Sequence, residues 1–233
     1  MKRIIKKCLS LFLIIKIIYI LILNRKFKVC LCTVAKLENK YIIEFIEHYK
    51  KYGIDKIFIY DNNDINGENF DFLSEYKRIN YIEIINYRGK KHPQIQIYRN
   101  CYKKNYNKYK WLLFFDVDEF IFLKKYSNIH DYLSKSSFLK CDSIYLNWLI
   151  HTDNNLIFYD NRTLSQRFPI SIKNKNFCIG KSIIRGNLKG IHIHSCHVLD
   201  KKLKICNSFG QQFIPNLTSC KIPDYKYNYY LLF

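Results

Sequence analysis

Along residues 27–123, apolar runs typical of strands alternate with segments whose apolar residues recur at the spacing of a helix. Four apolar runs of strand length are separated by stretches in which apolar residues recur at the spacing of an amphipathic helix. The expected strands cover residues 27–34, 56–60, 81–85 and 111–115, and the expected helices cover 38–52, 70–76 and 94–109. This alternation predicts an α/β fold with a mainly parallel central sheet and helices on both faces.

The pattern is weaker after residue 119. We expect a short strand at 120–123, a helix at 128–135 and a strand at 141–148, whereas residues 160–175 are polar and receive no assignment. Residues 180–185 and 190–194 are expected to be short strands, joined as a hairpin around Gly186 and Asn187. The Tyr-rich end at 225–233 is expected to pack as a tail.

Residues 1–26 form a separate N-terminal segment. Ile4–Leu23 is strongly apolar, with basic residues before and after it and Lys16 inside it. A central Lys costs roughly 2.5–3.5 kcal/mol in a membrane-spanning helix, which the surrounding Ile and Leu can offset. No small-residue cleavage site follows. The expectation is a signal anchor of a single-pass type II membrane protein, with a domain at 27–233 in the Golgi or secretory lumen if the source is eukaryotic. The alternative is an amphipathic or buried helix of a soluble protein.

The chain is strongly basic, with a formal net charge of +20 from 39 Lys and Arg against 19 Asp and Glu. Such a charge suits an anionic partner, namely a membrane surface, a nucleic acid or a nucleotide-sugar. No dense basic cluster falls on one predicted face, and Lys is abundant throughout. A membrane contact through the N-terminal segment is therefore expected, and a nucleic-acid partner is not.

The nine cysteines show no Cys-x-x-Cys motif and no zinc-ligand spacing. Cys30 and Cys32 lie on one face of the first strand and are expected to pack as small apolar residues. Four later cysteines are able to pair if the domain is exported: Cys178, Cys196, Cys206 and Cys220.

The candidate chemistry lies where the apolar strand at 111–115 ends. Asp116, Asp118 and Glu119 follow that strand directly, at the edge of the sheet where ligands of open α/β folds bind. In extended chain, Asp116 and Asp118 point to the same side. A bound divalent cation would relieve their repulsion, and oxygen ligands favour Mg²⁺ or Mn²⁺. Asp61 ends another parallel strand and belongs to the same edge. The alternative is a solvated acidic turn.

Several segments, in order, resemble glycosyltransferase family 92 and related family-2-like glycosyltransferases of the GT-A fold. The similar segments are Thr33–Glu38, Ile43–Tyr49, Gly53–Lys56, Ile59–Asn62, then Gln94, Tyr98 and Cys101, then Asp-Val-Asp-Glu-Phe at 116–120, then Trp148, Lys181–Arg185 and a downstream His. The resemblance covers residues 29 to about 197, which is nearly the whole domain. It implies a GT-A fold and a nucleotide-sugar donor.

The resemblance also implies residue roles. Lys36, Glu38, Asp61, Asp116 and Lys181 would bind the nucleotide-sugar. Asp116 and Asp118 would be the DxD pair that holds Mn²⁺ or Mg²⁺ against the diphosphate. A fixed cation stabilises the charge that the diphosphate gains as the sugar leaves. A late His would complete the metal shell, for which His194 is chosen and His192 and His197 stay open.

The acceptor side is less determined. Trp148 either stacks on a sugar ring or fills the core, and His151 lies in the same region. Asp153 is a candidate general base because it is a carboxylate in that region. Glu119 either acts on the acceptor or, as we prefer, supports its loop by hydrogen bonding. The sequence departs from the family at Leu37, where Asn is usual, and at 151–155, where a Phe-Gly-Ser-like loop is usual.

The resulting hypothesis is a metal-dependent glycosyltransferase. It would move a hexose from a UDP- or GDP-sugar to a glycan or glycoconjugate acceptor, with inversion. One rival is a catalytically inactive membrane-associated binding protein of the same fold. Another is a nucleotidyltransferase, which also uses paired carboxylates and a metal but releases pyrophosphate.

Overall fold

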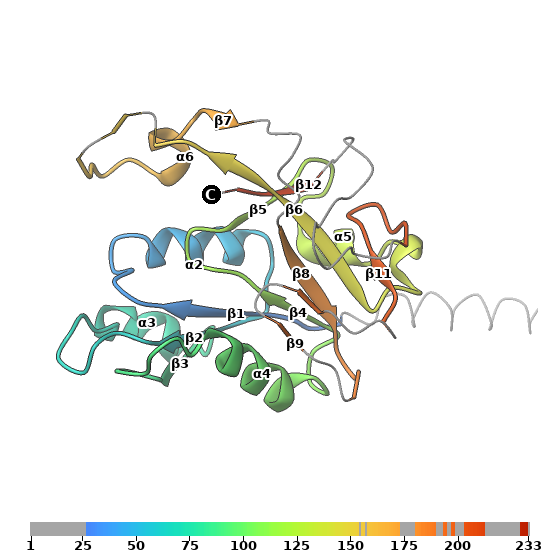
Figure 1. The fold of residues 1–233 in the computed structure, drawn as a ribbon, viewed down its shortest axis with the longest axis horizontal. Coiled ribbons are helices and arrows are strands. Elements are labelled where there is room, and N and C mark those ends of the chain that lie inside the picture. The colour runs from blue at the N-terminus through green and yellow to red at the C-terminus, as the bar shows by residue number, and fades with distance from the viewer. Residues whose placement is uncertain are drawn as a thin grey trace, which may run out of the picture.

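The computed structural model describes residues 27–153, 155–156, 158–172, 180–189, 193–194, 197–198, 203–212 and 229–232 (Figure 1). Its helices are α2 (Ile42–Lys51), α3 (Ser74–Arg78), α4 (Gln94–Asn105), α5 (Ile129–Leu133) and α6 (Leu164–Arg167), with 3-10 turns η1 (Asp71–Leu73) and η2 (Ser136–Phe138). Its strands are β1 (Val29–Ala35), β2 (Lys56–Asp61), β3 (Ile82–Asn86), β4 (Trp111–Phe114), β5 (Phe120–Leu123), β6 (Ser143–His151), β7 (Ser171–Ile172), β8 (Gly180–Arg185), β9 (Ile193–His194), β10 (His197–Val198), β11 (Ile205–Cys206) and β12 (Tyr229–Leu232).

One large sheet runs in the order β3-β2-β1-β4-β8-β6-β12-β5, with β7 and β11 added to β6. The strands β1 to β4 are mutually parallel, and β8 is antiparallel to both β4 and β6. β6 therefore points the same way as β4, and β12 pairs with it in parallel. The mainly parallel sheet predicted for an α/β fold is confirmed.

Alternating side chains of β1 explain the layers on the two faces of the sheet. Val29 and Leu31 are buried with the apolar face of α2, whereas Cys30 and Cys32 are buried on the opposite face with Tyr98 of α4. Figure 1 shows α2 and α4 on opposite sides of β1. Alternate side chains of β1 thus belong to two separate hydrophobic cores, as expected for a sheet with helices on both faces. The two thiols are free and buried, as predicted.

Two expectations for the C-terminal half are wrong. β9 pairs with β10 rather than forming a hairpin with β8, whose neighbours are β4 and β6. The Tyr-rich end contributes β12, which is inserted between β6 and β5 instead of packing as a tail. The β12 pairings join residues that are distant along the chain, so no local pattern in the sequence indicates them, whereas β9 and β10 are close in sequence but have two residues each, too few to show a period.

A disulfide joins Cys141 to Cys206, across 65 positions of the chain, and so fixes β11 beside the start of β6. Cys206 belongs to the cysteines expected to pair, whereas Cys141 does not. The other three expected partners, Cys178, Cys196 and Cys220, lie outside the described residues. So does the predicted anchor at 1–26. Among the described helices, none is both long and apolar enough to span a membrane.

Candidate active site

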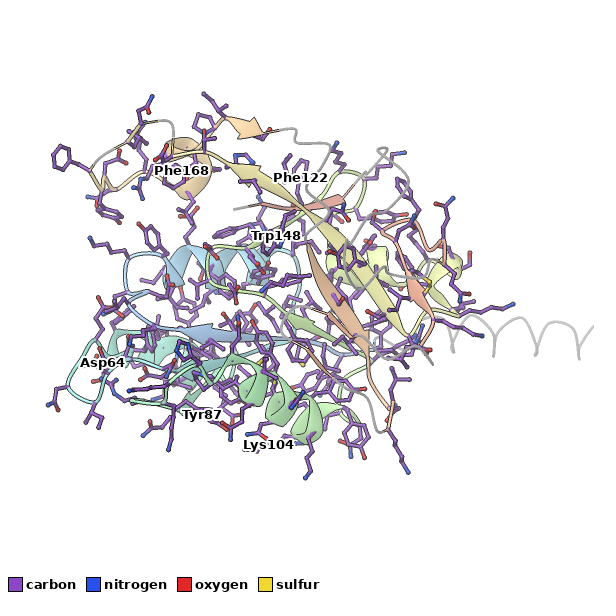
Figure 2. All side chains as sticks on the ribbon, in the orientation of Figure 1. Asp64, Tyr87, Lys104, Phe122, Trp148 and Phe168 are labelled. Atoms are coloured by element: carbon purple, nitrogen blue, oxygen red, sulfur yellow. A yellow bond between two sulfur atoms is a disulfide. The ribbon has the colours of Figure 1, made fainter. Side chains whose placement is uncertain are left out.

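The strand ends that the sequence placed at one edge of the sheet do meet there. Ala35 pairs with Asp61, and Asp61 pairs with Asn86, so β1, β2 and β3 end in line. Cys32 pairs with Phe114, which places the 115–119 segment beside the end of β1. Figure 2 shows Asp64 at the edge of the molecule where β1 and β2 end. The candidate site is built from the loops that leave this edge.

Asp116 is held on both carboxylate oxygens. Its Oδ1 accepts hydrogen bonds from Gln94 Nε2 and from the Tyr98 hydroxyl, each at 2.9 Å. Its Oδ2 accepts from Lys181 Nζ at 2.7 Å. These donors come from α4, which packs on one face of β4, and from β8, the strand beside β4, so the carboxylate has a fixed orientation while 36% of the side chain stays exposed.

Glu119 supports the loop that carries Asp116. It is fully buried, and its Oε2 accepts from the Asp116 backbone N–H at 3.0 Å. Its Oε1 lies 3.3 Å from Lys181 Nζ in an ionic contact that falls short of hydrogen-bond geometry. Burial raises the pKa of Glu119 well above its usual value, against the attraction of Lys181. The supporting role preferred from the sequence fits this placement.

The His-Tyr pair of α2 fixes the far side of the same loop. Tyr49 donates its hydroxyl to the Glu119 carbonyl at 2.7 Å and accepts from the Ile121 backbone N–H at 3.2 Å. Burial lowers the pKa of His48 to about 4, so the ring is neutral at pH 7. Its Nε2 lies 3.0 Å from the Ile121 carbonyl and therefore carries the proton that is donated there. His48 and Tyr49 belong to a segment that resembles the family, but the resemblance implies no role for them.

Asp118 and Glu38 add two partly enclosed carboxylates to the edge that carries Asp116. The Asp118 side chain is open to solvent, yet partial enclosure and the charge of Asp116 raise its pKa. Partial burial, followed by the charges of Asp118 and Asp116, raises the pKa of Glu38 to about 7. Mutual repulsion of this kind places the three carboxylates in one electrostatic cluster.

The cluster fits a divalent cation only in part. Among the described residues, no three His, Cys, Asp or Glu side chains are arranged to hold a metal ion by themselves. Mg²⁺, however, commonly takes one or two carboxylates and completes its shell with substrate phosphates and water. Asp118 and the exposed part of Asp116 meet that requirement.

Asp61 is placed at the edge, but its carboxylate is engaged by protein. Its Oδ1 accepts from the backbone N–H and the side-chain amide of Asn63, at 3.0 and 2.9 Å. Its Oδ2 pairs with Arg88 at 2.8 Å. Asn63 in turn accepts from the Leu37 backbone N–H at 2.8 Å. Asp61 thus ties the loops after β1, β2 and β3 together, while Lys36 lies exposed and pairs with Asp64 at 2.9 Å.

The acceptor candidates lie at the end of β6. Trp148 is half-buried and packs against the core on the α2 side of the sheet (Figure 2). His151 is bonded through Nδ1 to the Phe168 carbonyl, and its buried Nε2 has no hydrogen-bond partner within the described structure. Asp153 is exposed, and its carboxylate accepts from the Asn155 backbone N–H at 3.2 Å.

An aromatic and cationic surface that the sequence did not indicate lies beside α2. The ring of Tyr159 contacts that of Tyr41 with centroids 6.0 Å apart. Lys40 Nζ lies 4.6 Å and the Arg167 guanidinium 4.9 Å from the Tyr159 ring. The Leu164 backbone N–H donates to Glu44 at 3.0 Å, which ties this segment to α2. We call Lys40, Tyr41, Tyr159 and Arg167 the aromatic rim.

The late histidines are only partly placed. His194 lies in β9 opposite His197 in β10, and β9 packs against α4, the helix that holds Asp116. The side chains of both residues, and all of His192, lie outside the described structure. The assignment of His194 to the metal shell therefore stays a prediction.

Comparison with known proteins identifies the family. Residues 25–214 match the model of glycosyltransferase family 92, so the chain belongs to that family. It is 30% identical over 118 residues to a family 92 protein of Ricinus communis and 28% identical over 131 residues to one of Arabidopsis thaliana. These matches cover 48% and 53% of this chain but only 19% and 21% of the relatives. The resemblance to this family is confirmed, and the observed α/β fold agrees with the fold class predicted from the sequence.

Solved structures give weaker similarities. Staphylococcus aureus TarS 1–349 is 12% identical, with a TM-score of 0.43, over 68% of this chain and 47% of that one. The mannosyltransferase PcManGT of Pyrobaculum calidifontis, in complex with GDP-Man and Mn²⁺, is 6% identical, with a TM-score of 0.40, over 54% and 37%. GalNAc-T7 with UDP, GalNAc and Mn²⁺ is 15% identical, with a TM-score of 0.38, over 55% and 24%.

Proposed function

We propose that this chain is a metal-dependent glycosyltransferase that moves a hexose from a nucleotide-sugar to a glycan or glycoconjugate. Family membership supports the reaction class. The observation that carries the metal-dependent part is the carboxylate cluster of Asp116, Asp118 and Glu38, in which partial burial and then the charges of Asp118 and Asp116 raise the pKa of Glu38. A cation with a diphosphate beside it would satisfy that cluster.

Asp118 and Asp116 would hold Mn²⁺ or Mg²⁺ at the end of β4. When bound, the cation would supply charge stabilisation to the departing nucleoside diphosphate. The chain's own residues fix the geometry: Gln94 and Tyr98 orient Asp116, and Tyr49 fixes the loop at Glu119. Lys36 is an exposed lysine at the end of β1 and would line the nucleotide pocket, whose loops Asp61 would hold in place.

The placement of the carboxylates in the 116–119 loop favours a single displacement at the sugar, with inversion, over a covalent intermediate. Asp116 and Glu119 are held by hydrogen bonds, and Asp118 is assigned to the cation, so none of the three is assigned as a nucleophile toward the sugar. The acceptor hydroxyl instead needs a base, and the exposed carboxylate of Asp153 is our candidate. Trp148, His151 and the aromatic rim would contact the acceptor.

The proposed compartment is a secretory lumen, with residues 1–26 as the membrane anchor. The Cys141–Cys206 disulfide supports this, because disulfides persist in oxidising compartments. A type II orientation would place the domain and its disulfide together on the lumenal side.

The test is a donor screen with the full chain in detergent. UDP- and GDP-sugars are supplied with Mn²⁺, with Mg²⁺ or with EDTA, and released nucleoside diphosphate and pyrophosphate are measured separately. Metal-dependent release of nucleoside diphosphate supports the proposal. Release of pyrophosphate would instead identify a nucleotidyltransferase. Nucleotide binding without turnover would identify an inactive binding protein.

A further inference from the structure

Lys181 is a buried cation in contact with the proposed metal position. Its side chain is 4% exposed, with Nζ 2.7 Å from Asp116 Oδ2 and 3.3 Å from Glu119 Oε1. Its Nζ thus lies within ionic distance of two carboxylates, and that of Glu119 is fully buried. Lys181 therefore serves as a buried counter-ion for these two carboxylates and is not a solvent-exposed lysine.

The backbone leaves this lysine little freedom to move away. Gly180 precedes it, and a Cβ at that position would collide with the Leu146 carbonyl oxygen of β6. β8 thus lies tight against β6, while on its other side Leu113 of β4 pairs with Ile183. The register sets Lys181 next to the residue that precedes Asp116. Its position is determined by three adjacent strands.

Lys181 has a consequence for any cation that binds Asp116. The Oδ2 atom already accepts from Nζ, and Oδ1 already accepts from Gln94 and Tyr98. A cation arriving without donor would meet Asp118 and Glu38 as open carboxylates, would find both oxygens of Asp116 occupied, and would be repelled by the buried ammonium group. A cation arriving with a diphosphate would gain phosphate oxygens and additional negative charge.

We propose that Lys181 couples cation binding to donor binding, by keeping the metal position incomplete until a nucleoside diphosphate is present. This inference rests on the proposed function, because it assumes the metal and donor site described above. Lys181 is a positioning residue in this account, since it acts through Asp116. Coupling of this kind is reciprocal: the diphosphate strengthens Mn²⁺ binding by the same factor as Mn²⁺ strengthens diphosphate binding.

The variants must remove the cation without leaving Glu119 buried and unpaired, because breaking one side of a buried pair is strongly destabilising. The double variant Lys181→Met with Glu119→Gln removes both charges. A second double variant, Lys181→Gln with Glu119→Gln, does the same and lets the two amides bond each other. Glu119→Gln alone is the matched control, because it keeps Lys181 on Asp116. Melting temperature is recorded for each protein.

Binding of Mn²⁺ alone is measured from the free-ion EPR signal, using the full chain in detergent. Both double variants are expected to bind Mn²⁺ at least tenfold more tightly than the wild type, and Glu119→Gln is not. In a second titration, UDP and GDP affinities are measured with Mn²⁺ and with EDTA. The ratio of the two affinities is expected to be at least tenfold smaller in the double variants than in the wild type.

Equal Mn²⁺ affinity in wild type and folded double variants would overturn the coupling role. So would an equal gain in Glu119→Gln, because Lys181 is then not the cause. These results are distinct from failure of the proposed function, in which neither UDP nor GDP shows Mn²⁺-dependent binding to the wild type. That last outcome removes the basis of both proposals.

Discussion

Arg88 reaches from the loop after β3 to Asp61 at the end of β2, with its guanidinium 2.8 Å from the carboxylate. The same guanidinium donates to the carbonyls of Asp64 and Gly67 at 2.8 and 3.0 Å. One side chain therefore fixes the course of the loop that follows β2. The shape of the sheet edge proposed to bind the nucleotide therefore depends on the Arg88–Asp61 ion pair.

Replacing Arg88 by Met is expected to destabilise the fold by about 3 kcal/mol, because it leaves the Asp61 carboxylate buried without its cation. Urea unfolding followed by circular dichroism measures the change. The double variant Arg88→Met with Asp61→Asn should recover part of the loss. If Arg88→Met is as stable as the wild type, the pair does not hold these loops.

Leu37 has a left-handed backbone with φ of +60° and a side chain that is 62% exposed. Asn adopts this conformation more readily than Leu, which explains why Asn is the residue that the family usually has at this position. Leu37→Asn is expected to stabilise the protein by about 1 kcal/mol and to raise its melting temperature by about 2–4 °C. Leu37→Val, a β-branched control, should lower the melting temperature; a rise with Val would contradict the strain argument.

The stability of the chain should fall as pH rises through the range where Glu38 ionises. Its folded pKa of about 7 lies above its ordinary value of 4.5, so the native state binds the proton more tightly than the unfolded state. This stabilisation is complete below pH 4.5 and is lost by pH 8. Because Glu38 is partly exposed, we expect a loss of only about 1 kcal/mol.

Glu38→Gln removes this dependence on pH. Unfolding free energies at pH 5 and pH 8 should differ by less in the variant than in the wild type. Identical differences in the two proteins would show that neither burial nor the charges of Asp118 and Asp116 raise the pKa of Glu38.

Tyr159 is the most accessible ring of the aromatic rim, at 42% exposure. Tyr159→Ala is expected to raise the KM for acceptor by about five- to tenfold, through loss of ring contact worth about 1 kcal/mol. Donor hydrolysis without acceptor should not change, and Tyr159→Phe should keep most of the affinity because it keeps the ring. An unchanged acceptor KM in Tyr159→Ala would show that the aromatic rim does not bind the acceptor.

The sequence was informative wherever a local pattern determines structure. The period of two in β1 and the helical spacing in α2 predict both elements, and strand ends in a parallel sheet predict that Asp61 and Asp116 share an edge. It could not show that Lys181 clamps Asp116, because that contact depends on the register of β8 between β4 and β6. The aromatic rim was missed for a similar reason, since Tyr159 lies in a polar segment without periodicity.

Asp118 is the carboxylate on which the account depends most. Once the screen has identified a donor, transfer by Asp118→Asn is compared with transfer by Asp71→Asn, a control at an exposed aspartate of η1. We expect Asp118→Asn to fold normally and to lose at least about 100-fold in kcat/KM together with its metal dependence, while Asp71→Asn behaves as the wild type. Transfer by Asp118→Asn at the wild-type rate, with metal dependence intact, would contradict the account.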